Sequence, residues 1–257
     1  MKYILTVCVM LTIIGCTNQP GKPVLKSVQD YKEEQVEMVR QAIPFCGDFS
    51  QITNMGSISI VYTPGPCKIE VEGPKHLVDM TNVSVDSGVL MLSMSNERNQ
   101  DVQVYQGKRN ITAYISCPEL RIIAVCGSGD FRAEGKIHTD DMHVGSLSSG
   151  TITIDSIECS NLKFEVNATG KSTVSYMNVE NEFTLISSGR GMFVSDNVNV
   201  GGGLIMDDIV GSTLSCKGRT STLTISNSGD GVCEFIGAYK TKEVYQSEKA
   251  QVVIREF

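Results

Sequence analysis

The sequence has 257 residues, no tryptophan, 24 glycines and a formal net charge of −7. This length is enough for one or two domains with a buried core. The acidic balance, without any cluster of lysine and arginine, argues against a nucleic-acid partner, because binding to phosphate backbones needs clustered positive charge. Glycine among many serine, threonine, asparagine and β-branched residues favours short strands joined by tight turns over helices.

The first fifteen residues are typical of an export signal. Lys2 supplies a positive charge, and the apolar run ILTVCVMLTII, eleven residues long, is too short to span a bilayer. Gly15 stands directly before Cys16, and this ending resembles the lipobox of bacterial lipoproteins, in which the signal is cut before a cysteine that carries lipid. We therefore predict a lipoprotein signal peptide over residues 1–15 and lipidation of Cys16; the alternative is an ordinary secretory signal cut nearby.

Lipidation would make a membrane a partner of this protein. A single acyl chain holds a protein at a membrane only weakly, whereas bacterial lipoproteins carry several. The residue after Cys16 is Thr17, and not the aspartate that often retains lipoproteins at the inner membrane. The sequence thus predicts a cell-envelope protein at the outer membrane, facing either the periplasm or the outside.

Cysteines are numerous beyond the predicted lipidation site. Seven remain: Cys46, Cys67, Cys117, Cys126, Cys159, Cys216 and Cys233. An odd number in an exported protein leaves at least one thiol unpaired within the chain. No C-x-x-C occurs, so zinc-ribbon and thioredoxin-like interpretations lack their usual support. We interpret most of these cysteines as small buried hydrophobic residues and expect no cofactor.

Residues 16–45 resemble a tether between the anchor and a folded domain. TNQPGKP is rich in turn formers, and residues 24–43 carry a thin helical stripe, formed by Val28, Tyr31, Gln35, Val39 and Ala42. This stripe predicts a short amphipathic helix that ends at Pro44, with a flexible linker as the alternative. After it, alternating segments such as KIEVE and ITAYIS indicate antiparallel or irregular strands over residues 46–114.

A longer repeat begins near residue 126. One glycine marks the start of each unit, and these corner glycines are Gly129, Gly150, Gly170, Gly191, Gly211 and Gly231, at spacings of 21, 20, 21, 20 and 20. Small or polar residues recur six and eleven positions later, with apolar residues between them. Three corners and three short sides in about twenty residues describe one coil of a parallel β-helix.

The fold prediction is therefore an all-β, right-handed parallel β-helix with regular coils over about residues 115–250. It belongs to a domain spanning residues 46–250, followed by a C-terminal strand or tail at 251–257. Glycine suits the corners because it tolerates positive φ, and NSGDGV at 227–232 is interpreted as the last corner rather than a phosphate or metal loop. Hairpins of a β-sandwich, the alternative, rarely keep such regular spacing.

At these residues the sequence resembles the family of putative auto-transporter adhesin, head GIN domain proteins. The resemblance runs from FCGDFSQITNMGSISIVYTPG (45–65) through ISCPELRIIAVCGSGDF (115–131) to the coils ending near residue 245. It implies an exported protein, often a lipoprotein, with a β-helical domain. It brings no catalytic residues. The sequence departs from the family's Ser-Gly-Ser-Gly corners at NATGKS in the third coil and DIVGST in the fifth.

Three motifs imitate catalytic or metal sites. TGKST (169–173) resembles the end of a P-loop, but Glu165 occupies a required glycine position and the following residues alternate as a strand. In HTDDMH, strand alternation places His138 and Asp140 on one face and Asp141 and His143 on the other, which disfavours a metal site. His76 lies outside the coils, away from both of these motifs. We predict no metal and no catalytic residues.

The acidic pairs Asp140–Asp141 and Asp207–Asp208 lie three coils apart and neither stack nor face each other. No carboxylates or basic residues share one offset across adjacent coils, as a sugar-cleaving β-helix would require. The sequence therefore predicts a non-catalytic envelope lipoprotein with a binding or spacer surface, adhesin-like, whose glycan or protein ligand stays open. The alternative is a polysaccharide-active β-helix enzyme, a lyase or a glycoside hydrolase.

Overall fold

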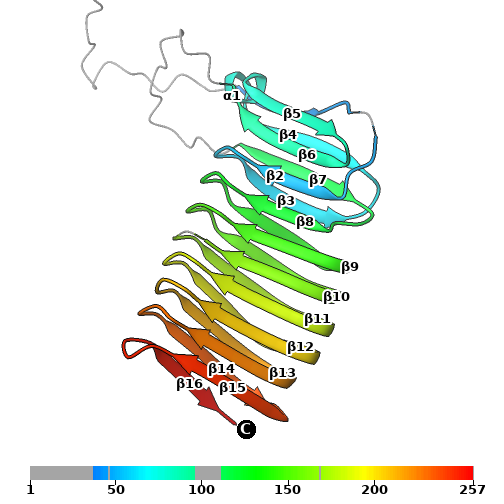
Figure 1. Ribbon diagram of the computed structural model, residues 1–257. Coiled ribbons are helices and arrows are strands. Elements are labelled where there is room, and N and C mark those ends of the chain that lie inside the picture. Colours follow the sequence, from blue (N-terminus) through cyan, green and yellow to red (C-terminus); the bar gives the residue numbers. More distant parts are fainter. Residues whose placement is uncertain (1–36, 46, 96–110, 168, 257) are drawn as a thin grey trace, which may run out of the picture. The chain divides into compact units, whose positions relative to one another are not determined.

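The computed structural model describes residues 37–45, 47–95, 111–167 and 169–256. Strands make up 70% of the described residues and helices 2%, and the strands form a β-solenoid of about six turns. Figure 1 shows the successive coils stacked in chain order, each strand beside the strand of the next coil. This confirms the predicted parallel β-helical fold. The predicted signal peptide, Cys16 and most of the tether lie outside the described residues.

The N-terminal part mixes parallel and antiparallel strands. Its elements are β1 (Met38–Ala42), β2 (Gln51–Asn54), β3 (Ser59–Pro64), β4 (Lys68–Pro74), α1 (Lys75–Asp79), β5 (Thr81–Asp86), β6 (Val89–Met94), β7 (Thr112–Cys117) and β8 (Ile122–Val125). β4 pairs antiparallel with β1 and β7, and β5 pairs antiparallel with β6. β2 and β3 instead pair parallel with their neighbours, so they already belong to the stack.

The regular coils follow. They comprise β9 (Phe131–Ser146), β10 (Ile152–Val166), β11 (Lys171–Ser187), β12 (Met192–Asp208), β13 (Thr213–Asn227), β14 (Val232–Ala238), β15 (Thr241–Gln246) and β16 (Gln251–Arg255). Each pairs parallel with the strand one coil away. β16 lies in the segment for which the sequence indicated a C-terminal strand or tail.

Each long strand covers three sides of its coil. In β11 the alternation of buried and exposed residues shifts phase at Ser175–Tyr176 and again at Glu180–Glu182. The buried residues are Ser172 and Val174 on the first side, Met177 and Val179 on the second, and Phe183, Leu185 and Ser187 on the third. The third corner is the tight turn between strands. The three-cornered coil inferred from the sequence is therefore confirmed, although the strand continues through two of the corners.

Inward side chains from successive coils form continuous columns. The column on the third side runs through Leu90, Ile52, Ile123, Val144, Phe164, Leu185, Met206, Ile225 and Val244. All of these except Val244 are buried. Phe164 and Phe193 pack edge to face with ring centroids 4.8 Å apart. A coil alone could not bury these side chains, so stacking supplies the hydrophobic stabilisation.

The corner glycines are needed for a different reason from the one predicted. Of the six, only Gly211 has a positive φ among the described residues. A Cβ on Gly150 would lie 2.3 Å from the carbonyl oxygen of Gly129, and one on Gly170 would lie 2.4 Å from that of Gly150. These distances are far inside van der Waals contact. Glycine is therefore required at the tight turns because each turn packs directly against the backbone of the preceding one.

Gly211 is not the fifth corner glycine. Met192 pairs with Thr213, so the residue in register with Gly191 is Ser212. The carboxylate of Asp208, fully buried, compensates for this change. Its Oδ1 accepts hydrogen bonds from the backbone N–H of Gly211 and Ser212, at 3.2 and 3.1 Å, and from the Ser212 hydroxyl at 3.0 Å. The true coil spacings therefore vary between 19 and 21 residues.

The helix predicted over residues 24–43 is wrong in its C-terminal part, because Met38–Ala42 form β1. Arg40 holds this strand against β4: its guanidinium bonds to Glu70 at 2.8 Å, approaches Glu72 at 3.4 Å and lies over the Tyr114 ring. Pairing with β4 therefore overrides a weak helical stripe. Residues 24–36 lie outside the described part. Within that part, no helix is long and apolar enough to cross a membrane.

Candidate functional site: a groove on the third side

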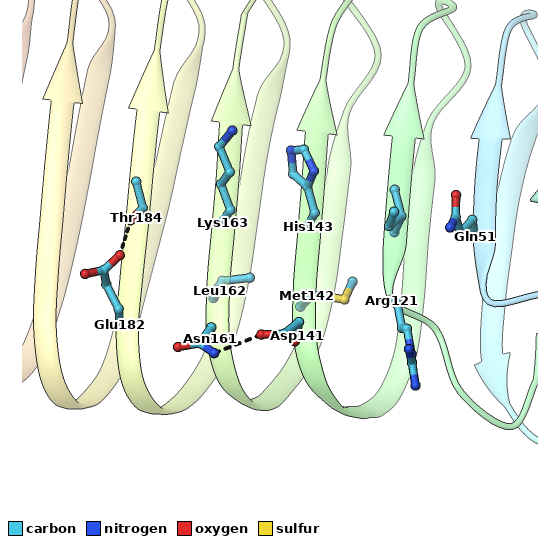
Figure 2. A pocket seen from close by; sticks show the side chains of 11 residues that line it. Gln51, Arg121, Asp141, Met142, His143, Asn161, Leu162, Lys163, Glu182 and Thr184 are labelled. Carbon is cyan, nitrogen blue, oxygen red and sulfur yellow. Dashed lines mark hydrogen bonds between the residues drawn. The ribbon is translucent and has the colours of Figure 1, made fainter.

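The third side of the solenoid carries a groove of about 590 Å³ that crosses several coils. Its lining residues are Gln51, Arg121, Ile122, Asp141, Met142, His143, Asn161, Leu162, Lys163, Glu182 and Thr184. Figure 2 shows their side chains on neighbouring strands of one sheet, with Lys163 and His143 side by side. The groove crosses the beginning of the third side, directly after the bend in β9, β10 and β11.

One row of the groove is formed by Asp141, Asn161 and Glu182, which are in register on successive coils. The Asn161 amide donates to the Asp141 carboxylate at 2.8 Å. The Thr184 hydroxyl donates to Glu182 at 3.1 Å. Because parallel strands lie about 4.8 Å apart, a side chain in one coil reaches its partner in the next. The row therefore presents hydrogen-bonding groups in fixed positions.

The second row carries positive charge. His143 and Lys163 are in register, and both face Glu165. The Lys163 ammonium contacts a Glu165 carboxylate oxygen, and Nε2 of His143 lies 3.5 Å from the same oxygen. The hydrogen bond from Lys163 holds the pKa of the Glu165 carboxyl below its usual range, with a smaller contribution from His143. Glu165 thus holds Lys163 in place, whereas the buried Nε2 of His143 has no hydrogen-bond partner among the described residues.

Arg121 closes the N-terminal part of the groove. Its guanidinium makes two bonds to the carboxylate of Glu119, at 2.8 and 3.1 Å. The Thr139 hydroxyl donates to the same carboxylate at 3.1 Å. These bonds lower the pKa of Glu119 and raise that of Arg121. The groove therefore has its charged groups paired before any ligand arrives, which reduces the cost of ordering them on binding.

The sequence analysis missed these rows. Asp141, Asn161 and Glu182 lie 12, 11 and 12 residues after their corner glycines, and the basic pair lies at offsets of 14 and 13. A search at one fixed offset therefore misses both rows. The statement that no carboxylates share one offset across adjacent coils is also wrong, because Glu134 and Asp155 both lie five residues after their corner glycines. Allowing each coil to differ by one residue would have placed His143 beside Lys163.

The structure places the two pairs of polar residues in HTDDMH on different sides of the coil and keeps the acidic pairs apart. His138 lies 3.9 Å from Glu158 on the second side, whereas His143 lies in the groove. Asp207 is in register with Ile186 and Ser226, and not with Asp141. Across the described residues, no group of three or more histidine, cysteine or acidic side chains could hold a metal ion.

TGKST does not open a helix. Lys171 begins strand β11, and the side chain of Ser172 is buried inside the coil. A P-loop instead needs a glycine-rich loop leading into a helix whose N-terminus faces phosphate. The structure therefore confirms the strand that the sequence predicted at this position.

The cysteines that the structure describes are free thiols, and four of them, Cys117, Cys159, Cys216 and Cys233, are buried. Cys67 is partly buried and Cys126 is exposed at a tight turn, while Cys46 lies outside the described residues. Burial raises the pKa of Cys117 to about 11 and that of Cys159 to about 12. Because the thiolate is the nucleophile, these buried groups act as core residues, as predicted.

These features together define a class of protein: a parallel β-solenoid with a polar groove on one side. The sequence pattern of the putative auto-transporter adhesin, head GIN domain family matches residues 48–244. The chain belongs to this family. No curated protein matches it.

Solved structures with the same fold support this assignment. A putative adhesin from Bacteroides fragilis is 19% identical, with a TM-score of 0.68 over 86% of this chain and 97% of that one. A putative adhesin from Parabacteroides merdae is 14% identical, with a TM-score of 0.61 over 86% and 97%. A putative lipid binding protein from Parabacteroides distasonis is 16% identical, with a TM-score of 0.61 over 85% and 98%. At these identities the likeness concerns the fold.

Proposed function

We propose that this protein is a non-catalytic, adhesin-like protein of the bacterial envelope that binds a glycan in the groove on the third side. The adhesin names of the family and of its structural neighbours support an adhesive role. The volume of the groove, about 590 Å³, lies within the range of ligand sites in proteins. The groove is also open along the coils, which suits an extended polymer.

The observation that carries this proposal is the alternation of donors and acceptors along the groove. Asp141 and Glu182 accept hydrogen bonds, Asn161 donates and accepts, and Lys163 and Arg121 donate. A sugar hydroxyl both donates and accepts, so a row of hydroxyls can satisfy such a surface. The described part of the groove has no aromatic side chain, so recognition would rest on hydrogen bonds rather than ring stacking.

The arrangement of carboxylates favours binding over cleavage. A glycoside hydrolase needs one carboxyl group kept protonated as a general acid by an apolar pocket or a neighbouring carboxylate. Asp141 and Glu182 are both exposed, and their neighbours are Asn161 and Thr184. Neither carboxyl group therefore lies in an apolar pocket of the kind that a general acid requires.

Attachment to the outer membrane through Cys16 is part of the same proposal. It is supported by Lys2, the apolar run and Gly15 before Cys16. The substitution Cys16→Ser should leave uncleaved precursor or release soluble protein. If that variant still fractionates with membranes, is processed normally and incorporates labelled palmitate, the anchor assignment is wrong.

A panel of glycans and polysaccharides tests the groove. We expect the full chain to bind at least one glycan, and both Lys163→Ala and Glu182→Ala to weaken that binding about tenfold or more, since each removes a charged hydrogen-bonding group. Lys171→Ala, which removes an exposed lysine from the first side, is the matched control and should bind normally. New reducing ends or unsaturated products would instead establish an enzyme.

A further inference from the structure

The C-terminal end of the solenoid leaves its core columns uncovered in the described structure. The column on the third side ends at Val244, which is 39% exposed although it is in register with fully buried Ile225. On the first side, Val252 and Ile254 extend the columns of buried Cys233 and Phe235, and both are only partly buried. Within the described residues, the last coil thus presents an apolar end.

Two edge strands, β15 and β16, close this end, and they differ in protection (Figure 1). β15 points the charged Lys242 inward, where its ammonium donates to the Tyr239 hydroxyl at 2.9 Å, and Tyr239 in turn bonds to Glu256. An inward charge is a common device against pairing between edge strands. β16 has no such charge at its centre, where its residues are Val252, Val253 and Ile254.

Alternate peptide groups of β16 point away from the molecule. The backbone N–H of Gln251 donates to the Gly231 carbonyl at 3.0 Å, toward the preceding coil. Successive peptide groups of a strand point to opposite edges, so the N–H and C=O groups of Val252 and Ile254 face the open edge. An apolar edge strand with such groups unpaired is a template for another strand.

We propose that β16 pairs antiparallel with β16 of a second copy of this chain, about a two-fold axis at Val253. In this register Val252 lies opposite Ile254 of the other copy. Those are the residues whose peptide groups face outward, so each pair can exchange two hydrogen bonds. The same two side chains point inward, and the apolar columns of the two copies therefore meet across the axis.

The outward-facing peptide groups of β16 are matched by those of an identical antiparallel strand, which selects a second copy as the occupant. In this register Gln251 lies opposite Arg255, and Ala250 lies opposite Glu256, so no like charges face each other across the strands. An isologous contact of this kind closes at two copies rather than growing into a fibre.

Pairing through β16 would leave the two N-terminal ends on opposite sides of the pair, because β1 and β16 are the two edges of one sheet. With the proposed anchor at Cys16, this arrangement suits contact between two envelope surfaces. Only this consequence rests on the proposed function. The pairing itself concerns the soluble chain, so its failure would leave the groove and the anchor untouched.

Sedimentation velocity over a range of concentrations tests the pairing. The full chain carries Cys16→Ser to prevent acylation and is kept under reductant, so that the exposed Cys126 cannot crosslink. We expect a concentration-dependent dimer. Val253→Lys places two positive charges opposite each other at the axis and should weaken the dimer at least about tenfold. Val194→Lys, at the same outward column position in an interior coil, should leave it unchanged.

A crosslinking measurement keeps the proposal testable if Val253→Lys fails to fold. Residues opposite each other in a non-hydrogen-bonded antiparallel pair have Cα atoms about 4.5 Å apart, within the range that a disulfide spans. In a Cys16→Ser, Cys126→Ser chain, Val253→Cys should crosslink two copies when copper phenanthroline accepts the two electrons, and Val194→Cys should not. A chain that stays monomeric at all concentrations, or equal crosslinking by the two variants, would overturn the proposal.

Discussion

The two ends of the solenoid are built differently. At the N-terminal end of the column on the third side, Leu90 is fully buried because β5 lies beside it with Val85 in register, and Leu77 and Val83 also pack against the core. At the C-terminal end, the same column stops at Val244, which is 39% exposed. The first end is covered by α1 and by the antiparallel pair β5–β6, whereas at the second end β15 and β16 each pair, among the described strands, with the preceding coil alone.

This difference shows what a stacked fold requires. Each interior coil is stabilised from both sides, but a terminal coil has only one neighbour, so solenoids need a terminal structure that covers the core. The chain supplies such a cover for the first coil by reversing strand direction. At the last coil the edge of β15 is protected by charge, and the edge of β16 is left for pairing. The following substitutions separate the two ends.

The largest effect is expected when a buried side chain at the covered end is shortened. Leu90→Ala removes a fully buried side chain and should lower the free energy of unfolding by about 2–5 kcal/mol. Val244→Ala, in the same column at the open end, should cost less than about 1 kcal/mol, because its side chain is already partly in water. Urea unfolding followed by circular dichroism measures both.

Val144→Ala is the control for residue type, since Val144 is a fully buried valine in that column. It should cost about 2 kcal/mol, from two lost methyl-sized groups and the cavity they leave. Equal costs for Val144→Ala and Val244→Ala would show that the C-terminal end is as well covered as the interior.

The tight turns should show the next largest effect. Gly150→Ala forces a Cβ against the Gly129 carbonyl, 2.3 Å away, and should destabilise the protein by about 1–3 kcal/mol. The equivalent position in the last coil is already Ala250, in a turn closed differently, by a bond from its N–H to the Ser247 carbonyl at 3.2 Å. The stacking requirement therefore ends where the coils end.

Gly145→Ala is the matched control within the same coil. A Cβ there would meet its nearest neighbour at 3.8 Å, an ordinary contact, so the melting temperature should change little. If Gly150→Ala were equally harmless, the tight turns would not pack as the structure describes.

The reactivity of the native cysteines compares exposed with buried positions, and the interior with the C-terminal end, without any substitution. Cys126, exposed at a turn, should react with iodoacetamide at least about a hundredfold faster than Cys159, whose pKa burial raises to about 12. Cys233 is also buried but belongs to β14, one coil from the open end. Mild urea should therefore expose Cys233 before Cys159, which peptide mass spectrometry can measure. If Cys159 reacted first, the C-terminal end would not be the less stable one.

The smallest effect concerns the charged row of the groove. The folded-state pKa of Glu165 lies below its unfolded value, so its interaction with Lys163 stabilises the protein above about pH 4.3 and is lost as the pH falls through the folded-state pKa. Lys163→Gln should cost less than about 1 kcal/mol at pH 7, because Lys163 is half exposed.

The loss of unfolding free energy caused by Lys163→Gln should shrink toward zero in acid, and unfolding curves at several pH values would show this. The looser pair at the open end, Arg255 with Glu234 at 4.0 Å, should contribute still less at neutral pH. A cost for Lys163→Gln that grew as the pH fell would contradict the assigned role of Glu165.

Much of the fold was predictable because regularly spaced glycines mark the coil repeat in the sequence. The spacing of Gly129, Gly150 and Gly170 predicts the stacking, and the phase of apolar residues predicts three sides. The reason for glycine was not predictable, since the carbonyl that it contacts belongs to the preceding coil, about twenty residues away. The register at Ser212 was also missed, because a glycine one position earlier imitates the repeat.

The groove and the covered end were harder to predict for the same physical reason. Coil lengths vary by one or two residues, so His143 and Lys163 meet in space although their offsets differ. Strand β1 depends on Arg40 finding Glu70 and Tyr114, which are distant in sequence. Local pattern therefore favoured a helix where long-range pairing makes a strand.

Amide hydrogen exchange in β16 tests the central claim, that the C-terminal end is an open edge which pairs with a second copy, most directly. At low concentration, the amides of Val252 and Ile254 should exchange fast, whereas those of Gln251 and Val253 should be protected by β14. At high concentration, Val252 and Ile254 should gain protection while the amides of β1 stay unchanged. If the protection of the Val252 and Ile254 amides did not change with protein concentration, whether that protection was strong or weak, the result would contradict the account.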